Sequence, residues 1–192
     1  YKTFCFFDVM MYTFNMKLKT FLNETELQQA IELDRQAYSN KDLVGSFEKC
    51  KQWLQVCPDM YIALYENKKM VGYINFVPLT AKCFDKFKNG KMCDSQINAR
   101  DILPFRKGEN FCLLMSIVIR KEYQNTKAIV LLTQALLDKI DNFANRGIYI
   151  PQFLAECVSV DGKKFITRTF DSKKISNSKN GEIYLCSFQK KQ

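Results

Sequence analysis

The chain has 192 residues, of which 47% are hydrophobic and 26% are charged, so it can bury one sizeable core and is not a disordered protein. Its formal net charge of +9 comes mostly from dispersed lysines without an arginine-rich stripe, which argues against nucleic acid and suits a phosphate-bearing cofactor. Histidine is absent, which excludes Ser-His and Cys-His catalysis and imidazole ligation of zinc, and we expect no metal site.

The N-terminal stretch is apolar but short. It lacks a basic start and Asp8 interrupts it, so it is neither a signal peptide nor a membrane span. We expect residues 1–12 to be a weakly ordered leader and residues 13–192 to form a single domain. No other segment is long enough to cross a membrane.

Two patterns mark the first strand and the first helices. From Thr13 apolar and polar residues alternate, as on a strand with one buried face. Asn23 then opens a helix, with Glu26 three residues later as in a capping box. A second helix begins at Ser46, and Pro58 ends it.

A hairpin and a long connection follow. Strands at 60–65 and 70–77 flank a turn of hairpin length, and Gly72 inside the second strand indicates a bulge or a close approach. Pro78 is expected to close the hairpin. Residues 79–110 are the least regular part, and we expect them to form a long surface connection that shapes a pocket.

The second half of the chain alternates strands and helices. Residues 111–119 are almost wholly apolar, which is typical of a central strand buried on both faces. A polar turn at 120–126 leads into a helix at 127–145, beyond which Gly147 is a natural cap. The remaining expected elements are a strand at 153–158, a helix opened by Asp161 that runs to Thr169, and a strand at 182–188.

The eight cysteines indicate a reducing compartment. None of them forms a CxxC pair, and several, such as Cys112 and Cys157, sit in apolar runs as small buried thiols do. Since no secretion signal is visible, we expect a reduced, cytoplasmic chain.

The segment from the strand at 111–119 into the helix at 127–145 has the clearest chemical meaning. The first N–H groups of a helix lack intrahelical acceptors and lie at the positive end of its dipole. A buried strand that runs through a tight polar turn into a long helix is therefore a site for an anion such as a pyrophosphate.

This segment resembles the pyrophosphate loop of the GNAT superfamily of acetyl-CoA-dependent N-acetyltransferases, whose signature reads approximately V-x-P-E-Y-R/Q-x-x-G-x-G/A. Ile119 matches the apolar strand end, and Glu122, Tyr123 and Gln124 match the residues that follow. The resemblance covers residues 13 to 188. It implies a mixed α+β fold whose central, mostly antiparallel sheet is splayed at its central strands and covered by helices on both faces.

The loop departs from the family pattern at three places. Lys121 replaces the proline, and Lys127 and Ile129 replace the two glycines that let the backbone approach the pyrophosphate. Lys127 adds a cation, whereas Ile129 adds bulk. In a second matching stretch, Phe165 stands where the family has a tyrosine as general acid.

The resemblance also implies a set of cofactor-binding residues. The backbone of the strand end would hydrogen-bond the pantetheine amides, the loop would hold the pyrophosphate, and the later short helix would flank the pantetheine arm. These residues are Ile117, Val118, Ile119, Gln124, Asn125, Thr126, Lys127, Ala128, Ile129, Ser159 and Lys163.

Attack of an amine on an acyl thioester needs a base, which a carboxylate can supply directly or through water. Glu156, on the strand beside the expected cleft, and Glu109, before the central strand, are the two candidates. Cys157 and Ser116 are weaker candidates as covalent nucleophiles, because no base is near them in the sequence.

Three functions remain open at this point. The first is an acetyltransferase that uses acetyl-CoA and an unidentified amine acceptor. The second is a catalytically weak or inactive module of the same fold that binds CoA or another anion, and the third is a basic nucleic-acid-binding protein. We rank them in that order, and the sequence is compatible with a homodimer.

Overall fold

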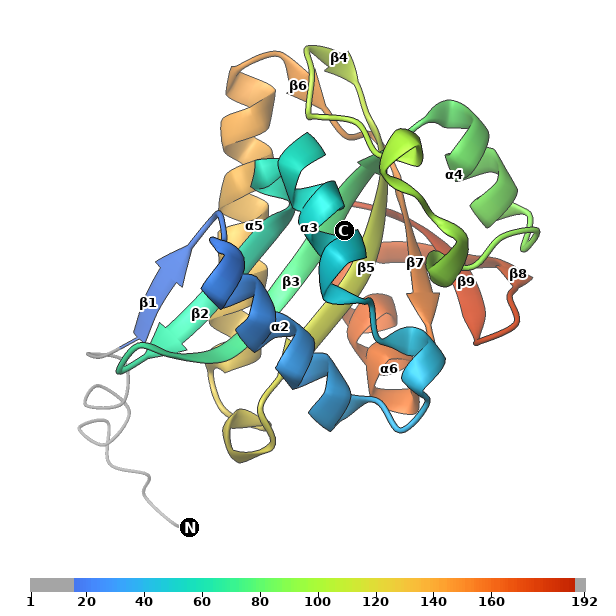
Figure 1. Ribbon diagram of the computed structural model, residues 1–192. Helices are drawn as coiled ribbons and strands as arrows, with labels where there is room; N and C mark the ends of the chain where they lie inside the picture. Colours follow the sequence, from blue (N-terminus) through green and yellow to red (C-terminus); the bar gives the residue numbers. More distant parts are fainter. Residues whose placement is uncertain (1–15, 189–192) are drawn as a thin grey trace, which may run out of the picture.

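The structure is a computed structural model that describes residues 16–188, built around one mixed sheet (Figure 1). Its seven strands lie in the order β1-β2-β3-β5-β7-β9-β8, and every neighbouring pair is antiparallel except β5 and β7. The strands are β1 (Met16–Lys19), β2 (Tyr61–Glu66), β3 (Lys69–Leu79), β5 (Phe111–Ile119), β7 (Phe153–Cys157), β8 (Asp171–Asn177) and β9 (Glu182–Ser187). The expected mixed α+β class with a mostly antiparallel sheet is confirmed, while the predicted leader at 1–12 lies outside the described residues.

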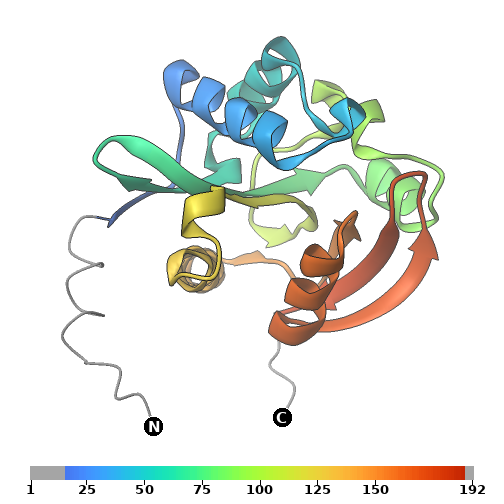
Figure 2. The ribbon, with the colours of Figure 1, turned by 90° about the horizontal axis from the view of Figure 1, so that it is seen from below.

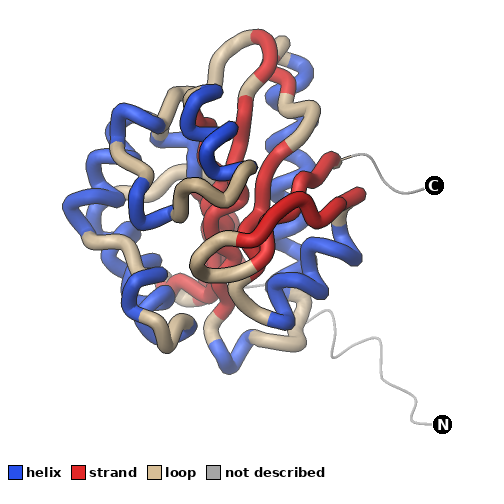
Figure 3. The backbone as a smooth tube through the Cα atoms, turned by 90° about the vertical axis from the view of Figure 1, so that its right-hand side faces the viewer, coloured by secondary structure: helices blue, strands red, loops and turns tan. Residues whose placement is uncertain are grey.

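Helices cover both faces of the sheet (Figures 2 and 3). One face carries α2 (Glu24–Ala37) and α3 (Phe47–Val56), and the other carries α5 (Ala128–Asn145) and α6 (Val160–Thr169). Each face has its own apolar core, with Leu27 among the fully buried residues of the first. The sheet is thus the middle layer of a three-layer unit. None of the helices within residues 16–188 is both long and apolar enough to cross a membrane.

The predicted helix starts follow from their caps. Asn23 and Glu26 form the expected capping box, in which each side chain accepts the other residue's backbone N–H at 2.9 and 3.0 Å. Ser46 caps α3 as predicted. The cap of α6 is Ser159 rather than Asp161, because the Ser159 hydroxyl accepts the Gly162 N–H at 3.0 Å.

The connection at 79–110 contains a helix that the sequence analysis missed. α4 (Ala81–Lys88) is capped by Thr80, and it buries Cys83, Phe84 and Phe87 at helical spacing. Its short length and its many lysines hid this pattern. Two short strands, β4 (Gly108–Glu109) and β6 (Ile148–Tyr149), pair in parallel and were also not predicted.

Pro78 does not end β3, contrary to the prediction. It pairs with Cys112, and its carbonyl accepts the Leu103 N–H at 3.0 Å on the side away from β5. Because β2 pairs with β3 only as far as Asn75, the missing N–H of Pro78 removes no hydrogen bond to β2. Edge strand β8 was missed as well, since its residues are largely polar and exposed.

Gly72 lies at a bulge and at a close approach, as predicted. The register between β2 and β3 shifts beside it, and a Cβ placed on Gly72 would lie 2.6 Å from the Val118 carbonyl oxygen of β5. This contact is with backbone, so it cannot be relieved by turning a side chain.

We therefore expect Gly72→Ala to lower the free energy of unfolding by about 2 kcal/mol through overpacking of the sheet. Urea denaturation measures this change. Gly162→Ala is the matched control, because its Cβ would meet only the Ser159 hydroxyl, at 3.1 Å, inside a helix where alanine is preferred. Equal stability of Gly72→Ala and the parent chain would contradict the close approach.

Candidate functional site

The sheet opens between its two parallel strands. β5 and β7 pair only from Cys112 to Leu114 on β5, although both strands continue. At the same place Met115 is an extra residue in β5, since Asn75 pairs with Ser116 and the next residue of β3 pairs with Leu114. The expected splaying of the central strands is therefore confirmed, and a bulge accompanies it.

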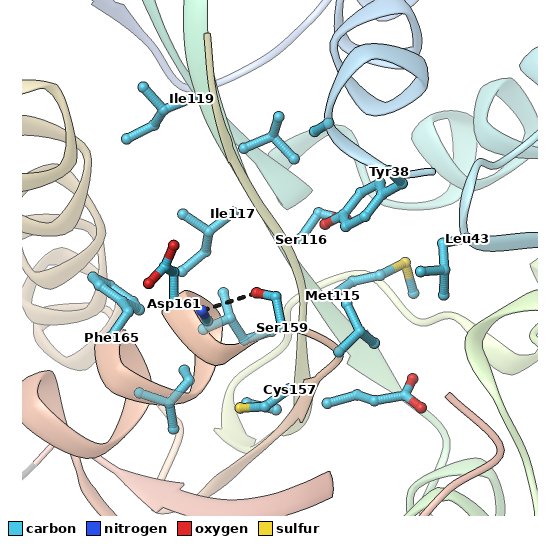
Figure 4. A pocket seen from close by; sticks show the side chains of 18 of the residues that line it. Tyr38, Leu43, Met115, Ser116, Ile117, Ile119, Cys157, Ser159, Asp161 and Phe165 are labelled. Carbon is cyan, nitrogen blue, oxygen red and sulfur yellow. Dashed lines mark hydrogen bonds between the residues drawn. The ribbon is translucent and has the colours of Figure 1, made fainter. Parts of the chain in front are cut away.

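A cleft of about 900 Å³ occupies this opening and reaches both faces of the sheet (Figure 4). On one face it is bounded by the end of α2, and on the other by the starts of α5 and α6. Its lining includes Tyr38, Leu43, Asp94, Met115, Ser116, Ile117, Val118, Ile119, Tyr123, Gln124, Asn125, Ile129, Glu156, Ser159, Asp161, Lys164, Phe165 and Arg168.

The backbone of β5 presents unpaired peptide groups to this cleft. The Arg120 N–H donates to Val71 at 2.8 Å, and the Val118 carbonyl points toward Gly72, so both groups face β3. Peptide groups alternate in direction along a strand, so those of Ile117 and Ile119 face the opening. The Ile119 carbonyl accepts the Gln124 side-chain amide at 3.2 Å, so Ile117 is the strand position at which both the N–H and the carbonyl remain open to a ligand.

The turn into α5 is held by side-chain hydrogen bonds of Tyr123 and Thr126 and by one left-handed residue, Asn125. The Tyr123 hydroxyl donates to Glu66 on β2. Asn125 takes a left-handed conformation with φ of 62°, which asparagine tolerates better than most residues. The Thr126 hydroxyl donates to the Tyr123 carbonyl at 2.6 Å and accepts the Ala128 N–H at 3.2 Å.

The start of α5 offers backbone donors next to the cleft. The Leu131 N–H makes an early helical bond, to the Lys127 carbonyl at 2.9 Å, so the N–H groups before it lie in the first turn, where intrahelical acceptors are lacking. The Ile129 side chain lines the cleft, whereas Lys127 is exposed beside it and Ala128 is buried. Gln124 and Asn125 line the cleft, but Thr126 does not.

At α6 the structure separates the two residues that the sequence analysis named. Ser159 lines the cleft as the cap of the helix. Lys163 does not line it, and its ammonium pairs with Glu182 at 2.8 Å. Two cations of α6 that sequence reasoning missed, Lys164 and Arg168, line the cleft instead.

The two candidate bases have different positions. Glu156 lines the cleft, where burial raises the pKa of its carboxyl above the usual range despite a hydrogen bond from the Ser178 hydroxyl. Glu109 is exposed on β4, next to its partner strand β6, and does not line the cleft. Only Glu156 is therefore placed where a base for chemistry in the cleft would act.

Tyr38 and Asp94 are lining residues that the sequence analysis did not name. Tyr38 follows α2, where its N–H donates to the Asp34 carbonyl at 2.8 Å, and its side chain lies beside Ser116 (Figure 4). Asp94 lies in the connection that was expected to shape a pocket. No local pattern marks either residue, because both reach the cleft through the packing of distant segments.

The described part of the chain contains no group of three or more histidine, cysteine, aspartate or glutamate residues that could hold a metal ion. The groups that the cleft offers to a ligand are a free strand edge, a helix start, two cations on α6, and carboxylates with a tyrosine near α2. This combination can hold an anionic, amide-containing ligand beside a proton acceptor.

Several solved structures have a similar fold. The loading GNATL domain of CurA from Lyngbya majuscula matches with a TM-score of 0.66 and 13% identity, over 91% of this chain and 98% of that domain. Naa50 from Arabidopsis thaliana, in complex with the bisubstrate analogue CoA-Ac-MVNAL, matches with a TM-score of 0.57 and 12% identity, over 92% of this chain and 99% of that chain. The ribosomal-protein-S18-alanine N-acetyltransferase from Escherichia coli matches with a TM-score of 0.52 and 13% identity, over 92% of this chain and 96% of that chain.

No protein-family model matches the sequence, and no curated protein matches it significantly. The structural matches extend over nearly the whole of this chain and of the three proteins named. The chain therefore has the fold of the GNAT acetyltransferases.

Proposed function

We propose that the chain is an acetyl-CoA-dependent N-acetyltransferase. The observation that carries this proposal is the free backbone edge of β5 at Ile117, which opens into a cleft beside the start of α5. A pantetheine arm contains amides that can pair with such an edge as an added strand, while a helix start binds pyrophosphate. Among the structural neighbours, Naa50 and PaiA from Thermoplasma acidophilum are described in complexes with a CoA conjugate and with coenzyme A.

In this proposal the cofactor lies on the α5 and α6 face of the sheet. The pantetheine arm runs along Ile117, Val118 and Ile119, with bonds at the first of these. Its pyrophosphate contacts the turn and helix start from Gln124 to Ile129, where Lys127 adds a positive charge. Ser159, Lys164 and Arg168 flank it from α6. Lys163 and Glu109 have no part in the proposal, because they lie outside the cleft.

The reaction joins the nitrogen of a primary amine to the thioester carbonyl carbon, and the carbon–sulfur bond breaks. Glu156 accepts the proton that the amine loses, directly or through water. A β5 N–H that faces the cleft can stabilise the developing oxyanion. Phe165 cannot donate a proton, so the CoA thiolate takes one from solvent.

Calorimetric titration with CoA tests the binding part of this proposal. We expect Lys127→Glu to weaken CoA binding about tenfold, because it places a negative charge at the positive end of the α5 dipole, beside the pyrophosphate. Lys107→Glu makes the same charge change on an exposed residue outside the cleft and should leave the affinity close to that of the parent chain.

The outcomes separate the enzyme from a binding module. Binding that Lys127→Glu weakens, together with thiol release in the presence of an amine, supports the acetyltransferase. Binding without thiol release for any primary amine leaves a CoA-binding module. If CoA at high micromolar concentration does not bind, the proposal fails.

A further inference from the structure

The wall of the cleft that faces α2 is chemically different from the rest. We call it the α2-side wall, and it consists of Tyr38, Leu43, Asp94, Met115, Ser116 and Glu156. Figure 4 shows Tyr38, Leu43 and Met115 on the opposite side of β5 from Phe165 and Asp161. Among the described lining residues, the only lysine and arginine are Lys164 and Arg168, and both belong to α6 on the other face.

The bulge in β5 explains why this wall is polar. Met115 packs in the core of the α2 face, and Ser116 lies beside Tyr38 at the end of α2 (Figure 4), so two consecutive side chains point to the same face. Asn75, the partner of Ser116 on β3, is only 4% exposed. Its side-chain carbonyl oxygen has no hydrogen-bond partner among the described residues, so a buried acceptor lies next to the wall without a donor.

None of the described lysines and arginines that line the cleft belongs to the α2-side wall, where its two carboxylates lie. Leu154 of β7 packs in the core of the α2 face. Side chains two residues apart on a strand point to the same face, so Glu156 also points to the α2 face. Its carboxylate accepts the Ser178 hydroxyl and forms no ion pair with any residue in the described range 16–188. Lys49 attracts Asp94, but its ammonium donates to the Ser95 carbonyl at 2.6 Å. The wall therefore presents acceptors and negative charge, although the whole chain is strongly basic.

This inference rests on the proposed function, since it concerns the acceptor for the same cleft. We infer that the α2-side wall selects primary amines that carry no carboxylate beside the nitrogen, and that it rejects free amino acids. An incoming ammonium or amine donates to the acceptors of the wall before Glu156 removes its proton. A carboxylate on the neighbouring carbon would be repelled by Asp94 and Glu156, and Lys49, the cation near Asp94, does not line the cleft and could not bind it directly.

Leucinamide and leucine form a suitable pair of probes. They differ only in the carboxyl group, and their isobutyl side chain suits the apolar Leu43 and Met115. Ligand-observed NMR titration of the complex with CoA measures the affinity of each probe without requiring turnover. We expect leucine to bind at least about 30-fold more weakly than leucinamide, as like charges at an interface are strongly disfavoured.

Substitutions of Asp94 test the cause of this preference. Asp94→Lys should weaken leucinamide about tenfold and strengthen leucine, and Asp94→Asn should shift both affinities in the same directions by less. Asp85→Lys makes the same charge change on an exposed part of α4 outside the cleft and should leave the preference as it is. Circular dichroism confirms that each variant is folded.

Two results would overturn the inference. One is equal binding of leucine and leucinamide, and the other is binding of neither probe to the complex with CoA. Failure of CoA itself to bind would instead contradict the proposed function. In that case titration of the probes into the free protein still tests the wall.

Discussion

Glu156→Gln is expected to lower kcat for acetyl transfer by about 10²–10³-fold, the contribution of a well-placed general base. The amide keeps the size of the side chain and can still accept from Ser178, but it cannot take the proton of the attacking amine. Thiol release from acetyl-CoA with leucinamide as acceptor measures the effect. CoA affinity should change little, because Glu156 points to the other face of the sheet.

The pH profile distinguishes a base from a merely structural carboxylate. Burial raises the pKa of Glu156, and activity should rise as the pH increases through that pKa, because the base acts in its deprotonated form. Ser178→Ala removes the hydrogen bond that lowers this pKa, so the rising limb should move to higher pH.

Glu109→Gln is the matched control for the same chemical change. Glu109 is exposed on β4 and lies outside the cleft, so kcat should stay at the parent value. A kcat of Glu156→Gln near that of the parent chain would exclude Glu156 as the base.

The second large effect concerns stability. Asp34 of α2 is buried and accepts the Tyr73 hydroxyl. Burial raises the pKa of its carboxyl to about 7, with a further contribution from Asp94. The folded chain thus binds a proton that the unfolded chain has released between pH 4 and pH 7. Stability falls as the pH rises through this window, by up to about 4 kcal/mol, because the ionised carboxylate is disfavoured inside the protein.

Asp34→Asn should remove this part of the pH dependence. The exchange of a carboxyl for an amide alters the hydrogen bonding of the buried group by an amount that does not depend on pH, so the informative quantity is the change in stability between pH 4 and pH 8. Urea denaturation of both chains at the two pH values gives it. We expect the free energy of unfolding to fall less between pH 4 and pH 8 in the variant than in the parent chain.

Tyr73→Phe provides the opposite case. The Tyr73 hydroxyl lowers the pKa of Asp34, so its removal should raise that pKa further and extend the loss of stability to higher pH. Parallel pH profiles of Asp34→Asn and the parent chain would show that Asp34 does not titrate with folding.

Local signals in the sequence predicted most of the helices and strands and several of the residues that line the cleft. The Asn23 and Ser46 caps and the apolar run at 111–119 act over a few residues, so their patterns can be seen without the fold. The strand, turn and helix that end at Asn145 form one continuous segment, and this is why Ile117, Gln124 and Ile129 were named in advance and all line the cleft.

Tertiary structure decided the remaining elements. α4 is short and lysine-rich, and β8 is a polar edge strand, so neither has a strong apolar period. Pro78 remains within β3 because β2 ends before it, which is a property of sheet order rather than of the local sequence. Lys163 could bind a phosphate and Glu109 could act as a base by residue type, yet neither residue lines the cleft.

The sequence by itself determined the caps of α2 and α3, the buried central strand and the turn into α5, because each depends on neighbours along the chain. Only the tertiary structure brought Tyr38 and Asp94 to Glu156, since these residues come from three separate segments that meet where β5 and β7 part. The opening itself is a consequence of sheet order, because the parallel pair β5 and β7 separates after Leu114 beside the bulge at Met115. It places the α2-side wall within reach of the free strand edge.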